Sequence, residues 1–250
     1  MLDKAAHLLD VFYPTGGALR LSELVMRTGL SKTTTYRLAG NLVQLGYLER
    51  TGEYYRLGNR LFELGSLVSR RLDLRETALP FLQDLFESTR QTVHFGVRDG
   101  FDIVYVERIH GHDSPALPSR IGGKLPLSCT AIGKALLAFC EEAACDLLAR
   151  ELPRLTPYSI TDPAVLRAAL EQIQLSGLAY EEQEAAVGVS CIAAPVFTGA
   201  RVVAALSVAV PQEQFRPAHL APAVRTAALG LSRVLRNGVT SGMKPPPLSG

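Results

Sequence analysis

The sequence lacks two features that mark whole classes of protein. Its four cysteines include no Cys-x-x-Cys pair, and no secretory signal precedes them, so we expect reduced thiols in a cytoplasmic protein rather than a secreted, disulfide-bonded one. No uninterrupted apolar run reaches the ~18 residues of a membrane span. We therefore expect a soluble protein with no membrane partner. Its 250 residues suffice for one large domain or two modest ones.

The net charge of +2 is small, but it is unevenly distributed. Residues 1–60 hold eight Lys or Arg and five Asp or Glu, a net charge of +3. The rest of the chain holds eighteen Lys or Arg and nineteen Asp or Glu, a net charge of −1. The positive excess therefore lies in the amino-terminal segment, where a polyanionic partner would require it.

A helix-turn-helix is predicted between Leu21 and Gly46. The first helix, starting at Leu21, is closed by Gly29, and Ser31 is a favourable N-cap for a second helix that runs to Gly46. The second helix has an apolar face made of Leu38, Leu42 and Leu45 and, opposite, an outward face made of Lys32, Thr33, Tyr36, Gly40 and Gln44, with Arg37 at its edge. This arrangement is typical of DNA-binding proteins, although a small helical subdomain with a solvated face would look similar.

The residues after the second helix favour DNA binding over that alternative. Tyr47–Arg50 and Tyr54–Leu57 predict two short strands around Thr51-Gly52-Glu53, which would form a β-hairpin wing. We expect side chains of the second helix to reach base edges and cations of the helix start and wing to bind phosphates. The predicted DNA-binding residues are Thr33, Tyr36 and Arg37 for bases, Lys32, Arg50 and Arg56 for phosphates, and Ser31 and Thr35 at the helix start.

Further helices are predicted on both sides of this motif. Residues 2–13 form an amphipathic helix that would complete a three-helix core, and residues 59–68 form a helix with a bare apolar stripe, for which a second copy of the chain is the expected partner. The predicted domains are a winged helix-turn-helix at 1–58, a linker helix at 59–75, an effector-binding and oligomerisation domain at 76–237 and a disordered tail at 238–250.

From residue 92 the hydrophobic period changes from helical to alternating. A hairpin of residues 92–98 and 102–109 is strongly signalled by Asp99-Gly100 at its turn. Hairpins mixed with helices predict an α+β domain with an antiparallel sheet. The further elements are strands at 178–182, 190–197 and 201–210, and helices at 128–139, 141–150, 162–175 and 218–236.

Several stretches, in this order and spacing, resemble the IclR (isocitrate-lyase-regulator) family of bacterial transcription regulators. They are LSELVMRTGLSKTTTYRLAGNLVQLGYLE with YYRLGNRLFELG, IGGKLPLSCTAIGKALLAF, and GLAYEEQEAAVGVSCIAAPVF with AALSVAVP. The resemblance implies an amino-terminal winged helix, a linker helix and a GAF-like carboxy-terminal domain that binds small effectors, often carboxylic acids. It also implies dimerisation through the first domain and linker, and binding of palindromic operators as a dimer or tetramer.

An anion-sized pocket is suggested by the residues themselves and detailed by the resemblance. The segment Leu127–Gly133 reads as a helix entry, whose first N–H groups lack intrahelical partners and suit a carboxylate. The resemblance matches Ala131 and Ile132 to positions that offer backbone N–H groups. It further matches Cys191 and Ser207 to side-chain ligands, Glu181 to an acidic position, and Leu125 and Val189 to apolar walls.

Two positions depart from the family pattern. Ala209 replaces a frequent serine, and Ile132 is bulkier than the usual residue. Both changes suggest a less polar or differently shaped pocket. Plainer interpretations also stand: Cys191 and Ser207 could be small packing residues, and Glu181 could belong to a solvated charge run.

Signals for other chemistry are weak. The two histidines of His110-Gly111-His112 have no Cys or carboxylate at metal-binding spacing, and Gly133-Lys134 fails the phosphate-loop pattern. The conceivable nucleophiles Ser128, Cys129 and Cys191 lack a Gly-x-Ser-x-Gly elbow or another recognisable partner motif. His94, His110 and His219 are conceivable general bases for such a nucleophile. Because the nucleophiles lack a supporting motif, we expect no catalytic residue, and we expect no metal or cofactor.

These observations predict a sequence-specific DNA-binding transcriptional regulator, with repression as the favoured sign, controlled by a small organic or aromatic acid. One alternative is a constitutive DNA-binding protein whose second domain only oligomerises. Another is a thiol-based redox sensor that uses Cys191 or Cys129.

Overall fold

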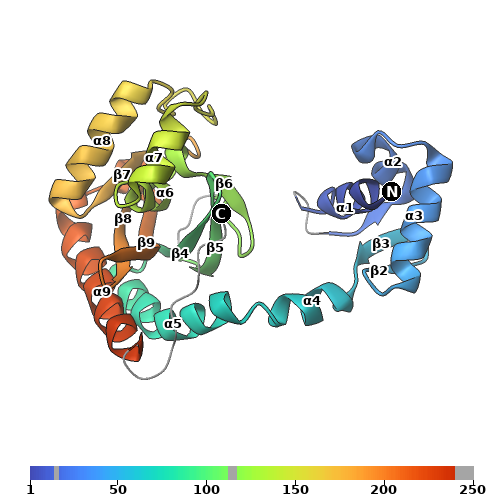
Figure 1. Ribbon diagram of the computed structural model, residues 1–250, viewed down its shortest axis with the longest axis horizontal. Coiled ribbons are helices and arrows are strands. Elements are labelled where there is room, and N and C mark those ends of the chain that lie inside the picture. The colour runs from blue at the N-terminus through green and yellow to red at the C-terminus, as the bar shows by residue number, and fades with distance from the viewer. Residues whose placement is uncertain (14–16, 112–116, 240–250) are drawn as a thin grey trace. The chain divides into compact units, whose positions relative to one another are not determined.

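The structure is a computed structural model that describes residues 1–13, 17–111 and 117–239 (Figure 1). The chain divides into two compact units, Met1–Leu72 and Asp73–Gly250. The division falls inside helix α5 (Ser69–Thr89). Of the predicted tail, residues 238 and 239 end helix α9, and residues 240–250 lie outside the described residues.

The first unit is a winged helix-turn-helix, as predicted. Its helices are α1 (Leu2–Asp10), α2 (Leu21–Thr28), α3 (Lys32–Gln44) and α4 (Asn59–Ser66). Its sheet has the strand order β1-β3-β2, with β1 (Leu19–Arg20), β2 (Leu48–Thr51) and β3 (Tyr54–Leu57). The two-residue strand β1 was not predicted, and α1 ends three residues earlier than expected.

Local chemistry explains where these helices begin and end. Gly29 has φ +65°, the left-handed conformation that closes α2. The Ser31 hydroxyl accepts a hydrogen bond of 3.3 Å from the Thr34 N–H at the start of α3. The core joins α1 to α2 and α3 through buried leucines and Phe12. Leu45, predicted on the apolar face of α3, is 62% exposed because it lies just beyond the end of the helix, where the chain turns.

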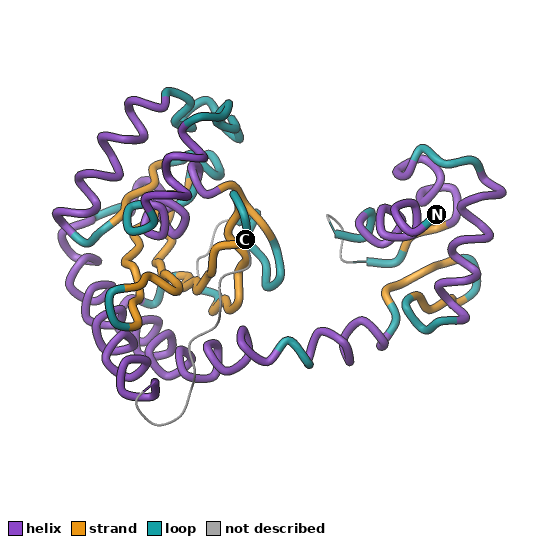
Figure 2. Tube along the Cα trace, in the orientation of Figure 1, coloured by secondary structure: helices purple, strands orange, loops and turns teal. Residues whose placement is uncertain are grey.

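The second unit is built on a six-stranded antiparallel sheet, which confirms the α+β prediction (Figure 2). The strand order is β6-β5-β4-β9-β8-β7. The strands are β4 (Thr92–Asp99), β5 (Asp102–Ile109), β6 (Lys124–Pro126), β7 (Ala179–Glu182), β8 (Val189–Thr198) and β9 (Arg201–Pro211). The sequence did not predict β6 as a strand.

Helices cover both faces of this sheet (Figure 1). Helices α5 and α9 (Pro217–Val239) pack on one face, in a core that includes Leu82, Phe95 and Leu231. Helices α6 (Ala131–Leu137), α7 (Glu141–Leu148) and α8 (Pro163–Ser176) pack on the other face, around Ile132, Leu147 and Leu166. No helix in the described ranges is long and apolar enough to cross a membrane.

Helix α6 starts later than the predicted Ser128. Residues Leu127–Cys129 form a single 3-10 turn, and Thr130 then caps α6 by accepting a 3.0 Å hydrogen bond from the Gly133 N–H. Gly133 permits this sharp change of direction, because a Cβ there would overlap the carbonyl oxygen of Leu127.

A β-bulge in β5 places the side chains of Tyr105 and Glu107, which are two residues apart, on opposite faces of the sheet. Gly96 pairs with Tyr105 whereas Phe95 pairs with Glu107, so that Val106 is the extra residue. Tyr105 thus packs on the α6 face. Glu107 pairs with Arg75 of α5 at 2.6 Å, on the other face.

Candidate functional site

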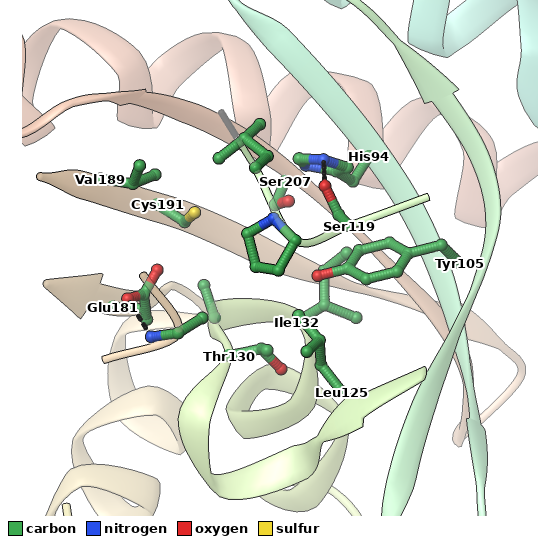
Figure 3. A pocket seen from close by; sticks show the side chains of 14 residues that line it. His94, Tyr105, Ser119, Leu125, Thr130, Ile132, Glu181, Val189, Cys191 and Ser207 are labelled. Carbon is green, nitrogen blue, oxygen red and sulfur yellow. Dashed lines mark hydrogen bonds between the residues drawn. The ribbon is translucent and has the colours of Figure 1, made fainter. Parts of the chain in front are cut away.

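A cavity of about 30 Å³ lies between the sheet and the start of α6 (Figure 3). This volume holds roughly two water molecules. The cavity is lined by segments that are far apart in the sequence: the strands of the sheet, the first residues of α6 and the segment 117–119. All seven predicted effector-binding residues line it, namely Leu125, Ala131, Ile132, Glu181, Val189, Cys191 and Ser207.

Half of the residues that line the cavity were not predicted from the sequence. The additional residues are His94, Tyr105, Leu117, Pro118, Ser119, Thr130 and Ala185. Strand alternation placed His94 and Tyr105 in a hairpin, but alternation does not reveal which face of a sheet meets a cavity. Thr130 lies in the helix entry that the sequence indicated, and the other residues come from loops, for which the sequence carried no signal.

Glu181 on β7 is an integral part of the cavity wall, which contradicts its interpretation as a solvated charge. It is 1% exposed, and its Oε1 accepts hydrogen bonds from the N–H groups of Glu184 at 2.5 Å and Ala185 at 3.1 Å. Burial raises the pKa of its carboxyl from 4.5 to about 7, against the lowering effect of the Ala185 N–H. The carboxyl therefore fixes the turn after β7 and titrates near neutrality.

A buried ion pair connects that turn to α6. Lys134 Nζ lies 2.5 Å from Glu184 Oε1, with side chains 3% and 7% exposed. The hydroxyls of Thr156 and Ser159 donate to the Glu184 carbonyl from the loop before α8. The turn is thus held by contacts with β7, with α6 and with the loop before α8.

The two candidate thiols are poor nucleophiles in this environment. All four cysteines lie in the described part of the chain and are free thiols. Burial raises the pKa of the Cys129 thiol, and burial together with the charge of Glu181 raises the pKa of the Cys191 thiol well above its usual value. Because thiolates are the reactive species, these environments disfavour the redox-sensor alternative.

His94 on β4 is held neutral. Its Nε2 lies 2.7 Å from the Ser119 hydroxyl, and burial, followed by the charge of Arg108, lowers its pKa to about 3. A histidine with so low a pKa is a weak general base. No group of three or more potential metal ligands occurs within the described ranges; His112 of the weak metal motif lies outside them.

The first unit presents a second candidate surface, on α3 and the wing. Ser31, Lys32, Thr33, Tyr36 and Arg37 are all exposed. Thr35 is the exception, which corrects its prediction: it is fully buried, and its hydroxyl donates to the Ser31 carbonyl at 3.0 Å. Its side chain supports the helix start and does not face outward.

The wing divides the two predicted phosphate-binding arginines between its faces. Cross-strand partners share a face, and Arg50 pairs with the buried Tyr55, whereas Arg56 pairs with Glu49. Arg50 accordingly lines a groove with Lys32 and Tyr36, whereas Arg56 lies on the opposite face of the wing.

Arg20, which the sequence analysis did not single out, also lines this groove. Its guanidinium donates to the Tyr54 hydroxyl at 2.8 Å and lies 5.0 Å from the ring centroid. The short strand β1 that carries it left no periodic signal in the sequence.

Two family descriptions match this chain. Residues 1–52 match the IclR helix-turn-helix domain, and residues 66–233 match the bacterial transcriptional regulator IclR C-terminal domain. The chain is 36% identical to the HTH-type transcriptional regulator XynR of Escherichia coli over 94% of this chain and 96% of that protein. It is 30% identical to the E. coli transcriptional repressor IclR, over 84% and 79%.

A solved structure is similar to this chain over most of its length. It is an IclR homologue from Microbacterium hydrocarbonoxydans in complex with 4-hydroxybenzoate. The TM-score is 0.84 at 29% sequence identity, covering 94% of this chain and 99% of the homologue.

Replacing Glu181 by Gln should flatten the pH dependence of stability of the second unit. The folded-state pKa of about 7 exceeds the ordinary 4.5, so the folded chain binds more protons between these values and its free energy of unfolding falls as the pH rises through them. The loss at this site is roughly 3 kcal/mol in the wild type, and Glu181→Gln abolishes it. Urea unfolding at about pH 5 and about pH 8 measures the difference.

The matched control for this experiment is Glu182→Gln, at the exposed neighbouring position, which should retain the wild-type slope. A Glu181→Gln protein whose stability declines as steeply as that of the wild type contradicts the assignment.

Proposed function

Because the chain belongs to the IclR family of bacterial transcriptional regulators, we propose that it represses transcription from a palindromic operator under the control of a small organic or aromatic acid. The acid binds in the cavity of the second unit. One observation carries the effector part of this proposal: the seven residues singled out for effector binding, drawn from β6, α6, β7, β8 and β9, line one cavity.

The DNA-binding role is supported by the exposed face of α3. A helix-turn-helix inserts its second helix into the major groove, with side chains near the amino end of that helix at the base edges. Thr33, Tyr36 and Arg37 occupy that part of α3 and are exposed. Lys32 and Arg50, which share a groove, take the phosphates, together with Ser31 at the helix start.

The size of the cavity determines how an effector would act. A space of about 30 Å³ is too small for an aromatic acid such as the 4-hydroxybenzoate bound by the Microbacterium homologue. An acid of that size has to displace lining side chains, so it binds an expanded arrangement better than the present one. That difference in affinity is what a ligand needs to shift a protein between conformations, with coupling of ~1–3 kcal/mol between sites.

A second copy of the chain is the proposed partner of α4. All eight residues of α4 are described and none is buried; Phe62 is 79% exposed and Leu67, at its end, 74%. Exposed apolar side chains gathered on one element mark association surfaces. We propose a homodimer, or a tetramer built from dimers, acting in the cytoplasm and having no catalytic activity.

The predicted DNA contacts are separable by substitution. Arg37→Ala should reduce discrimination between a selected operator fragment and random duplex by roughly 1–3 kcal/mol, because a base contact is lost. Arg50→Ala should weaken both duplexes alike and lower the salt slope by about one unit, because a phosphate contact is lost. Fluorescence anisotropy over a range of salt concentrations measures both effects.

Arg56→Ala is the matched comparison from the opposite face of the wing. An equal loss in Arg50→Ala and Arg56→Ala would assign both faces of the wing to DNA. An Arg37→Ala protein that loses affinity for both duplexes equally contradicts the base-reading role of Arg37.

Calorimetry with a panel of small carboxylates and aromatic acids tests the effector role against the constitutive alternative. We expect at least one acid to release heat on binding and to change operator affinity by roughly fivefold or more. The matching amides, which lack the charge, are the controls. If no acid in the panel binds or shifts the operator complex, the constitutive alternative is supported instead.

Phe62→Asp should dissociate the dimer, because it places a charge in the proposed apolar interface. Ser66→Asp adds the same charge at a polar position of the same helix and should leave the dimer intact. Light scattering coupled to size-exclusion chromatography gives the mass in each case. A wild-type chain that elutes as a monomer, or a Phe62→Asp chain that stays dimeric, contradicts this interface.

A further inference from the structure

One tyrosine of the cavity wall directs its hydroxyl into the cavity (Figure 3). Tyr105 on β5 is 6% exposed, and its hydroxyl points into the cavity (Figure 3). Its ring packs against His94 with 5.1 Å between the ring centroids, so that the phenol is held in place. A phenol hydroxyl that opens into a cavity can donate a hydrogen bond to a molecule bound there.

Charged groups of opposite sign lie on two different sides of the cavity. Tyr105 and Arg108 lie on β5, whereas Glu181 lies on β7, with three strands of the sheet between them. The Arg108 guanidinium donates to the carbonyl of Ser119, which lines the cavity, and its Nε is buried without a hydrogen-bond partner in the described ranges. The side of β5 is therefore positive and the side of β7 acidic.

We propose that Tyr105 is a ligand-binding residue and that its phenol donates a hydrogen bond to the carboxylate of the acid bound in this cavity. The carboxylate lies on the β5 side, near the charge of Arg108 and away from the carboxyl of Glu181. This rests on the proposed function, because it names the group of that same cavity that meets the acid.

The chemistry of the phenol supports donation. Burial raises the pKa of Tyr105 well above its usual value, and the nearby carboxyl of Glu181 acts in the same direction, so the hydroxyl keeps its proton. A protonated phenol facing an anion forms a charge-assisted hydrogen bond, which is stronger than a neutral one.

The test is calorimetric titration of the full-length chain with benzoate and with 4-hydroxybenzoate. Tyr105→Phe removes only the hydroxyl, and we expect it to weaken binding of both acids by about ten- to a hundredfold, since a hydrogen bond to a charged group is lost. The control is Tyr180→Phe, on β7 and outside the cavity lining, which should bind both acids as the wild type does.

Three outcomes of this titration overturn the proposal. Unchanged affinity of Tyr105→Phe for an acid that the wild type binds overturns it and leaves the proposed effector role intact. A loss confined to 4-hydroxybenzoate assigns Tyr105 to the ring hydroxyl and overturns the carboxylate contact. Failure of both acids to bind the wild type overturns this proposal together with the aromatic-acid part of the proposed function.

A second measurement does not depend on the folding of a variant. In the wild-type chain labelled with carbon-13 at tyrosine Cζ, one tyrosine resonance should shift when benzoate is added, since Tyr105 is the tyrosine of the cavity lining. A spectrum in which no tyrosine resonance moves at saturating benzoate overturns the proposal.

Discussion

The buried pair of Lys134 and Glu184 holds two walls of the cavity together. Lys134 belongs to α6, whose first residues line the cavity, and Glu184 to the turn after β7. Removing either partner would leave a buried charge uncompensated, which is strongly destabilising. The same turn is anchored by Glu181 through two backbone N–H groups, so the position of the acidic wall relative to α6 depends on this network.

The sheet imposes a second constraint on the cavity. Its strands place Cys191 and Ser207 on one face, while α5 and α9 cover the other. The bulge at Val106 allows β5 to contact both layers, with Tyr105 toward the cavity and Glu107 paired to Arg75 of α5. The strand that carries the cavity phenol is therefore tied by the buried carboxylate of Glu107 to helix α5.

Local signals in the sequence predicted most elements because caps and turns are decided by neighbouring residues. Ser31 and Gly29 act on the backbone within a few positions, and α3 begins and α2 ends beside them. Periodicity failed where an element was too short to show it, as with β1 and β6. It also failed at Leu45, where the helix ends before the apolar pattern does.

The sequence by itself determined the winged helix-turn-helix, the α+β second domain and, through family resemblance, seven residues of one cavity. Only the tertiary structure decided that His94, Tyr105 and Ser119 join them, that Thr35 faces inward and that Glu181 is buried. The reason is physical: caps and periodicity act over a few residues. The face that a side chain presents, and the pKa that burial gives it, depend on segments that meet only when the sheet forms.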